Sequence, residues 1–106
     1  MEDRPRLAVA RVEGVEHLAV EVGEAAIVER ALASFGRLDV LIHNAGVIES
    51  APVAELAEAD FRRVFEINTL SALRLTQAAL PAMRRQRYGR LVYTTSTAGL
   101  YGNAGL

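Results

Sequence analysis

The longest patterned stretch of the chain is a stripe of mainly apolar side chains that recurs every third or fourth residue between positions 61 and 83. Its members are Phe61, Val64, Phe65, Asn68, Ala72, Leu75, Thr76, Ala79 and Met83. Steps of three and four place side chains on one face of an α-helix, so the stripe predicts a long helix with one buried face. Pro81 is expected to kink or end that helix, because proline lacks the N–H that continues the hydrogen-bond ladder. The basic run 84–87 and the following Gly89 are typical of a helix C-terminus.

A strand and a shorter helix are predicted before this stripe. Residues 16–22 alternate between polar and apolar side chains, which favours a strand. Helical spacing then runs from Ile27 to Phe35, and Gly36 stands where a helix-terminating glycine is expected.

Two further strands complete the pattern. The apolar run 40–42 is bounded by polar residues, which suits a parallel strand buried on both faces. Residues 90–96 are rich in β-branched side chains and predict a third strand, whereas the glycines of 98–106 predict a loop. The order strand–helix–strand–helix–strand predicts an α/β fold with a three-stranded parallel sheet and right-handed crossovers.

Composition narrows the class of protein. The 106 residues allow one domain, with 1–15 as a loose lead-in and 16–106 as the core. A net charge of −1 gives no electrostatic footprint for nucleic acid or an anionic membrane, so neither is expected as a partner. The absence of cysteine excludes disulfides and thiolate zinc sites. The N-terminus does not resemble a signal peptide and no apolar run reaches membrane-spanning length, so a soluble cytoplasmic protein is expected.

Polar residues follow two of the predicted strands, where open parallel sheets bind their ligands. Asn44, Ala45 and Gly46 come after the second strand, and their small size lets a backbone approach a ligand closely. An ordinary strand-to-loop turn explains this segment equally well. We interpret His43 as a packed, hydrogen-bonded histidine and not as a catalyst. Because His17 is the only other histidine in the sequence, no metal site is expected.

Ser96 and Asn68 are the other candidates. Ser96 follows the third strand, where its hydroxyl could donate to a substrate carbonyl, although serine often simply ends a strand. A nucleophilic serine is not indicated, because the surroundings are not G-x-S-x-G. Asn68 places a primary amide on an otherwise apolar stripe. Either the backbone satisfies this amide, or it holds a water or opens the helix near the site.

Four segments in order resemble the short-chain dehydrogenase/reductase family over residues 18–106. They are the segment 35–46 that ends in His43-Asn44-Ala45-Gly46, then Ile67-Asn68-Thr69, then Leu80-Pro81-Ala82-Met83, and finally Tyr88-Gly89-Arg90-Leu91-Val92 running into Ser96-x-x-Gly99. The resemblance implies a partial Rossmann-like, doubly wound sheet and a nicotinamide-dependent oxidoreductase acting on an alcohol or ketone. It implies NAD or NADP as cofactor. It also implies subunit contacts through the long helix, and hence a homo-oligomer for the full-length enzyme.

The resemblance assigns cofactor contacts to two segments. Asn44, Ala45 and Gly46 match the family's N-N-A-G turn on the adenosine side of the cofactor, with a histidine in place of the first asparagine. Glu21 and Val22 stand where the family's Asp-Val meets the adenine.

It also assigns catalytic roles. Asn68 matches the helix asparagine that holds a proton-relay water, and Ser96 matches the serine that polarises the substrate carbonyl. The stretch from Tyr88 to Gly105 is similar to hydroxyacyl-CoA dehydrogenases and 3-oxoacyl reductases of the family, which implies a 3-hydroxyacyl or 3-oxoacyl thioester as substrate.

Two family motifs are missing from these residues. There is no glycine-rich phosphate loop, and all 12 basic residues are arginine, so no Tyr-x-x-x-Lys pair exists. Without that lysine nothing brings a tyrosine hydroxyl from its usual pKa of about 10 toward neutrality. We therefore expect a fragment that is inactive alone. The alternative is a non-catalytic module that docks through the helix around 58–86, with Leu70, Leu73 and Leu80 exposed.

One structural expectation follows from the missing segments. In the family, further strands separate the strand matched by 16–22 from the strand at 40–42. We expect 16–22 to pair directly beside 40–42 here.

Overall fold

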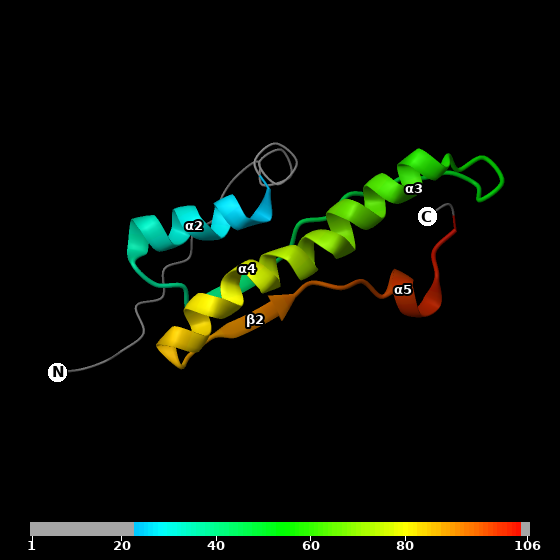
Figure 1. The fold of residues 1–106 in the computed structure, drawn as a ribbon. Coiled ribbons are helices and arrows are strands. Elements are labelled where there is room, and N and C mark those ends of the chain that lie inside the picture. The colour runs from blue at the N-terminus through cyan, green and yellow to red at the C-terminus, as the bar shows by residue number, and fades with distance from the viewer. Residues whose placement is uncertain (1–22, 105–106) are drawn as a thin grey trace.

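The computed structural model describes residues 23–104 of the chain, which form the elements labelled in Figure 1. In chain order these are α2 (Glu24–Phe35), β1 (Val40–His43), α3 (Glu58–Phe65), the π-helical turn η1 (Glu66–Leu70), α4 (Ser71–Gln86), β2 (Arg90–Tyr93) and α5 (Ala98–Tyr101). The strand predicted at 16–22 lies outside the described residues, and so does its expected pairing.

The sheet confirms the predicted parallel α/β architecture. β1 and β2 pair in parallel with Val40 opposite Arg90 and His43 opposite Tyr93. The long helix between the two strands is the crossover that a parallel pair requires. Within residues 23–104 the sheet has two strands, which correspond to the strands predicted at 40–42 and 90–96, so a three-stranded sheet is not shown in the described structure.

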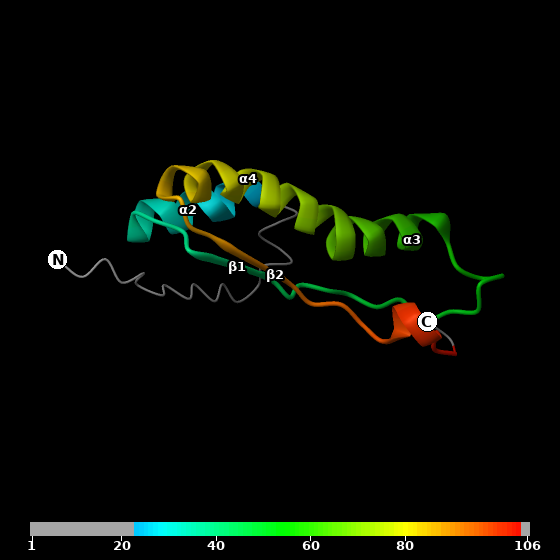
Figure 2. The ribbon, with the colours of Figure 1, turned by 90° about the horizontal axis from the view of Figure 1, so that it is seen from below.

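Helices α2 and α4 cover one face of this sheet, and Figure 2 shows them on one side of the two strands. The core between them consists of Val28, Leu38, Leu75, Ala79 and Met83, against which Leu41 and Leu91 pack from the strands. Strand side chains alternate in direction, so the neighbours of these two leucines point to the other face. Ile42 and Val92 are accordingly exposed, so the strand at 40–42 is not buried on both faces as its apolar run predicted.

Helix α2 ends as its sequence predicts. Gly36 adopts the left-handed conformation with φ of +74°, and its N–H donates to the Leu32 carbonyl at 2.8 Å. A residue with a Cβ is strained in this conformation, which is why glycine is typical there.

The long helix was expected to kink or end at Pro81. It does not end there, since Pro81 lies inside α4 on its exposed face. The carbonyl that Pro81 leaves without a helical partner belongs to Gln77, also on the exposed side, where water can bond it.

The start of the long helix differs from the prediction. Phe61 and Phe65 were predicted to face inward but are 59% and 47% exposed. Figure 1 shows the reason, because α3 extends past the end of the strands and has no sheet beneath it.

The C-terminal part also differs from the expected loop. β2 ends at Tyr93 instead of continuing to position 96, and residues 98–101 form the short helix α5. The Ser96 hydroxyl oxygen accepts the Ala98 N–H at 3.2 Å. This bond satisfies one of the free donors at the start of the short helix.

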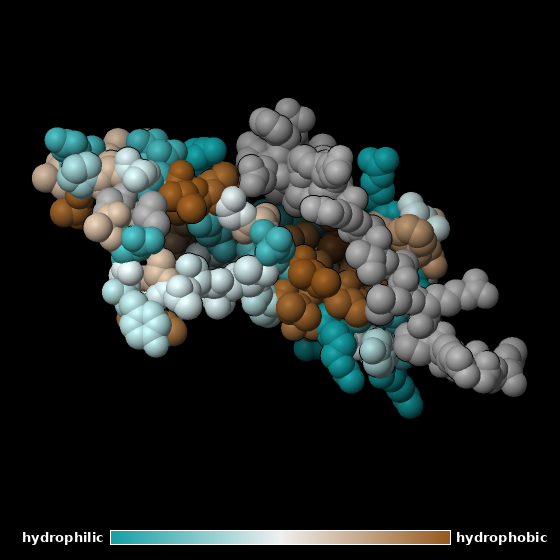
Figure 3. All heavy atoms as spheres, turned by 180° about the vertical axis from the view of Figure 1, so that it is seen from behind, coloured by the Kyte–Doolittle hydropathy of each residue, from teal (hydrophilic) through white to brown (hydrophobic). Residues whose placement is uncertain are grey.

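Large apolar side chains remain exposed on several elements of the described structure, and Figure 3 shows brown apolar groups on one face. Among residues 23–104 no helix combines the length and apolar character needed to cross a membrane.

Candidate functional site

The carboxyl ends of β1 and β2 lie next to each other because the strands are parallel and in register. The Thr94 N–H donates to the His43 carbonyl at 2.9 Å, one step beyond the last strand pair. The segment 44–46 leaves the sheet here beside the segment that carries Ser96. The structure therefore brings two of the predicted site segments to one edge of the sheet.

Asn44 is exposed, and its side chain has no hydrogen-bond partner among residues 23–104. Ala45 is half-buried and Gly46 is exposed. A Cβ added to Gly46 would lie 3.7 Å from the Asn68 Oδ1, an ordinary contact. Within the described structure, the amide of Asn44 is thus available to bond a ligand, and nothing crowds the backbone beside it.

Asn68 lies in the middle of η1, so the helix opens where the amide interrupts the apolar stripe. Its Oδ1 accepts the Val47 N–H at 2.8 Å, and its Nδ2 donates to the Val47 carbonyl at 2.9 Å. Backbone atoms therefore satisfy the amide, and they do so within a π-turn. Such turns occur frequently at functional sites. The second Nδ2–H of Asn68 has no partner among the residues that the structure describes.

His43 is packed and hydrogen-bonded, as its surroundings in the sequence favoured. The side chain is buried, and its Nε2 lies 2.7 Å from the Ser71 Oγ. Within the described part of the chain no three His, Cys, Asp or Glu side chains gather in a way that could hold a metal ion.

Ser96 is exposed just past the end of β2. Its oxygen accepts the Ala98 N–H, which leaves the hydroxyl proton available to a ligand. Tyr93, the last residue of β2, bonds the Thr76 hydroxyl across to α4, and Tyr101 is exposed on α5. Glu21 and Val22, the predicted adenine contacts, lie outside the described residues.

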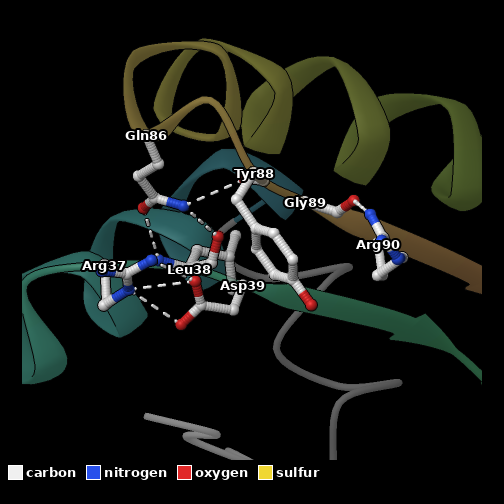
Figure 4. Close-up of polar contacts among 7 residues, drawn as sticks. All are labelled: Arg37, Leu38, Asp39, Gln86, Tyr88, Gly89 and Arg90. Carbon is white, nitrogen blue, oxygen red and sulfur yellow. Dashed lines mark hydrogen bonds and ion pairs between the residues drawn. The ribbon is translucent and has the colours of Figure 1, made fainter. Parts of the chain in front are cut away.

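The opposite end of β1 holds a second polar cluster, drawn in Figure 4. Gln86 accepts the Leu38 N–H at 2.9 Å and donates to the Leu38 carbonyl at 2.8 Å. Beside it Arg37 makes a two-pronged ion pair with the buried carboxylate of Asp39. The Gln86 bonds fasten the end of α4 to the residue pair before β1, away from the candidate site, whereas the Arg37–Asp39 pair lies within that segment.

Two residues near the site were not identified from sequence. Ser71 lies three positions after Asn68 on the same helix face, and this spacing is a signal that was available. Val47 contributes only backbone atoms, so no side-chain pattern could have revealed it.

Comparisons with known proteins place the chain in a family. A family model described as short chain dehydrogenase matches residues 17–106. The peroxisomal hydratase-dehydrogenase-epimerase of Saccharomyces cerevisiae is 41% identical over 99 residues, covering 93% of this chain and 10% of that protein. The 3-oxoacyl-(acyl-carrier-protein) reductase FabG of Thermotoga maritima is 37% identical over 79 residues, covering 74% of this chain and 32% of the reductase.

Nodulation protein G of a Rhizobium species is 32% identical over 110 residues, covering 90% of this chain and 45% of that protein. The chain therefore spans between a tenth and just under half of the length of these three relatives. The family match covers the whole described structure and includes both segments at the edge of the sheet. The chain belongs to the short-chain dehydrogenase/reductase family of oxidoreductases.

Proposed function

We propose that this chain is part of an NAD- or NADP-dependent enzyme that transfers hydride between a nicotinamide and an alcohol or ketone carbon. The observation that carries the proposal is the placement of Asn44 and Ser96 at adjoining strand ends, joined by the Thr94–His43 bond. The names of two relatives, a hydratase-dehydrogenase-epimerase and a 3-oxoacyl reductase, support a 3-hydroxyacyl or 3-oxoacyl thioester as the substrate class.

The residues at this edge fit a dinucleotide. Asn44 offers an amide without a partner in the described structure, and the small side chains of Ala45 and Gly46 leave the backbone accessible. In this proposal Asn44, Ala45 and Gly46 contact the adenosine side of the cofactor, as do Glu21 and Val22. When bound, the nicotinamide supplies or accepts the hydride.

The substrate side of the proposal concerns Ser96 and Asn68. The Ser96 hydroxyl donates a hydrogen bond to the substrate carbonyl, which stabilises the negative charge that develops on the oxygen. The remaining Nδ2–H of Asn68 holds a water of the proton relay, while the Val47 bonds keep the amide in place. The proton itself comes from a group outside these 106 residues, which contain no lysine to accompany a tyrosine. The chain alone is accordingly expected to be inactive.

A chimera tests the proposal. Residues 17–106, the span that the family model matches, replace the corresponding segment of the Thermotoga maritima reductase, and ketone reduction is followed through the nicotinamide absorbance. We expect turnover, with Ser96→Ala lowering kcat/KM by about 10²–10³-fold, the typical effect of removing one such donor. Thr95→Ala is the matched control, because Thr95 is an exposed hydroxyl residue at the same strand end without a partner in the described structure. Equal losses in the two variants would contradict the role of Ser96.

A binding measurement tests the expectation that the chain alone does not form a complete cofactor site. The isolated chain is titrated with NADH and followed by fluorescence. We expect no saturable binding, and a micromolar Kd would show that the cofactor site is complete within these residues.

The alternative is a non-catalytic module that docks through the helix 58–86. Phe61, Phe65 and Leu73 favour it, since all three are about half exposed on one continuous helix. Leu70 and Leu80, which were also predicted to be exposed, are half-buried instead. The turnover of the chimera discriminates the two, and sedimentation analysis of the chain and of its Phe61→Ser variant tests whether this helix forms a contact. An inactive chimera, together with loss of self-association in the variant, favours the module. The same helix is the proposed contact of a homo-oligomer in the full-length enzyme.

Location in the cell is a separate proposal. We propose a cytoplasmic location, which is the expectation from the sequence, although several relatives carry names that describe them as peroxisomal. Fluorescence microscopy of the tagged full-length protein decides between the two compartments.

A further inference from the structure

The segment 44–46 is anchored on both sides to the same stretch of helix. On its N-terminal side the His43 Nε2 lies 2.7 Å from the Ser71 Oγ, and on its C-terminal side Val47 makes two hydrogen bonds with Asn68. Asn68 lies within η1, and Ser71 is the residue that closes it. The position of the three residues between these anchors therefore depends on the geometry of the π-turn.

Ser71 holds the π-turn through two bonds. Its backbone N–H donates to the Glu66 carbonyl, five residues earlier, which is the bond that defines a π-turn. Its hydroxyl donates to the Ile67 carbonyl. A serine hydroxyl has one proton, so the Ser71 oxygen can only accept from the His43 ring. The geometry thus assigns the proton to Nε2 of His43 and gives an ordered chain from His43 through Ser71 to Ile67.

An ion pair on the outer surface of the π-turn holds the turn less firmly than the His43–Ser71 bond does. Arg74 pairs with Glu66 and reaches Glu24 at 3.9 Å. The hydrogen bond to Glu66, together with the charge of Glu66, raises the pKa of Arg74. All of these groups except Glu24 are substantially exposed, and water and salt weaken such pairs. His43 and Ser71 are buried, so their bond is screened much less.

We propose that His43 is a positioning residue, which fixes the π-turn through Ser71 and thereby sets the segment Asn44–Gly46 for its ligand. The inference rests on the proposed function, because the segment binds a cofactor only in that proposal. The bonding chain itself is independent of it. His43 does not touch a substrate or cofactor in this scheme, and it acts through the turn.

Nuclear magnetic resonance tests the tautomer in the unmodified chain. The ¹⁵N shifts of the His43 ring are expected to show a protonated, pyrrole-type Nε2. A pyridine-type Nε2 would overturn the proposal, since Ser71 would then have to donate to His43 and release Ile67.

Hydrogen exchange tests the positioning. His43→Leu keeps the bulk but removes the donor, and Ser71→Ala removes the link. In both variants the Val47 amide is expected to exchange about tenfold faster, as the loss of a buried hydrogen bond implies. His43→Gln places an amide nitrogen at about the reach of Nε2 and is expected to restore the slow exchange. The Gly36 amide, bonded to Leu32 on α2, is the internal control and stays unchanged.

Two outcomes contradict the proposal. Unchanged Val47 exchange in His43→Leu shows that the turn holds without the histidine. Equal acceleration at Val47 and Gly36, with no rescue by His43→Gln, shows that His43 only packs. Neither outcome bears on the proposed reaction, which the chimera tests separately through its turnover.

Discussion

The two ends of β1 are held by the same chemical device in different surroundings. At the start, the amide of Gln86 bonds both the N–H and the carbonyl of Leu38, and after the end the amide of Asn68 does the same for Val47. Leu38 is buried, whereas Val47 is half-buried and next to exposed residues. We call the start of β1, beside Leu38, the closed end and the segment after β1, beside Val47, the open end. At the closed end the two bonds of the Gln86 amide hold the backbone in place. At the open end the Asn68 amide makes the same two bonds, and polar groups beside it stay available to a ligand.

Substituting Gly89, which lies near the closed end, gives the largest expected effect. A Cβ on Gly89 would lie within 2.8 Å of three atoms of Met83, whose own Cβ is among them. Because Met83 is part of the core, it cannot simply move away. Gly89→Ala is expected to lower the free energy of unfolding by about 2–3 kcal/mol, the upper range for overpacking. Urea denaturation measures it, with Gly99→Ala as control because no atom lies within 4 Å there.

Removing the Gln86 amide comes next. Gln86→Leu leaves the buried N–H and carbonyl of Leu38 without partners. This loss is expected to cost about 1–3 kcal/mol of the free energy of unfolding. Gln77→Leu, at an exposed position of α4, should be nearly neutral. If the two variants unfold at the same urea concentration, the Gln86 bonds do not stabilise the closed end.

The matching change at the open end is expected to be smaller. Asn68→Leu frees the same two backbone groups of Val47. Water reaches them more easily there, so we expect a loss of about 1 kcal/mol. Amide exchange should increase at Val47 more than at Leu38. A loss as large as that of Gln86→Leu would remove the distinction between the two ends.

The smallest effect is expected for Ser96→Ala. The side chain is exposed and makes one hydrogen bond, of 3.2 Å, to the Ala98 N–H. The free energy of unfolding should therefore change by no more than about 0.5 kcal/mol, as is usual for surface substitutions. Thermal unfolding of the isolated chain checks this. A larger loss would mean that Ser96 stabilises the start of α5, and that its effect in the chimera is partly structural.

Local patterns predicted most of the described elements. The glycine end of α2 and the strand at 40–42 depend on near neighbours and were confirmed, whereas the strand predicted at 90–96 was confirmed only over Arg90–Tyr93. The exposure of Phe61 and Phe65 was not predictable, because it depends on where the sheet stops. The position of the π-turn was not predictable either. One widened turn hardly changes the spacing of the apolar side chains along the helix.

In the candidate site, too, local residue patterns could be read from the sequence and long-range contacts could not. Asn44, Asn68 and Ser96 were proposed as site residues from residue type and from the resemblance, and in the structure Asn44 and Ser96 lie at one sheet edge. The partners of Asn68 were not identified, because the backbone of Val47 carries no side-chain signal. The Gln86–Leu38 bonds join residues far apart in the chain, and nothing local marks them.

The amides of Asn68 and Gln86 also tie the length of the helix between them to the length of the chain between Leu38 and Val47. The stretch from Asn68 to Gln86, at the rise of an α-helix, spans roughly 27 Å. The stretch from Leu38 to Val47, as extended chain, spans roughly 30 Å. The length of the helix therefore has to match the length of the strand segment, and inserting or deleting a single residue in either span would pull one amide out of register. Length variation in this chain is tolerable only outside these two spans, a restriction that side-chain chemistry alone would not impose.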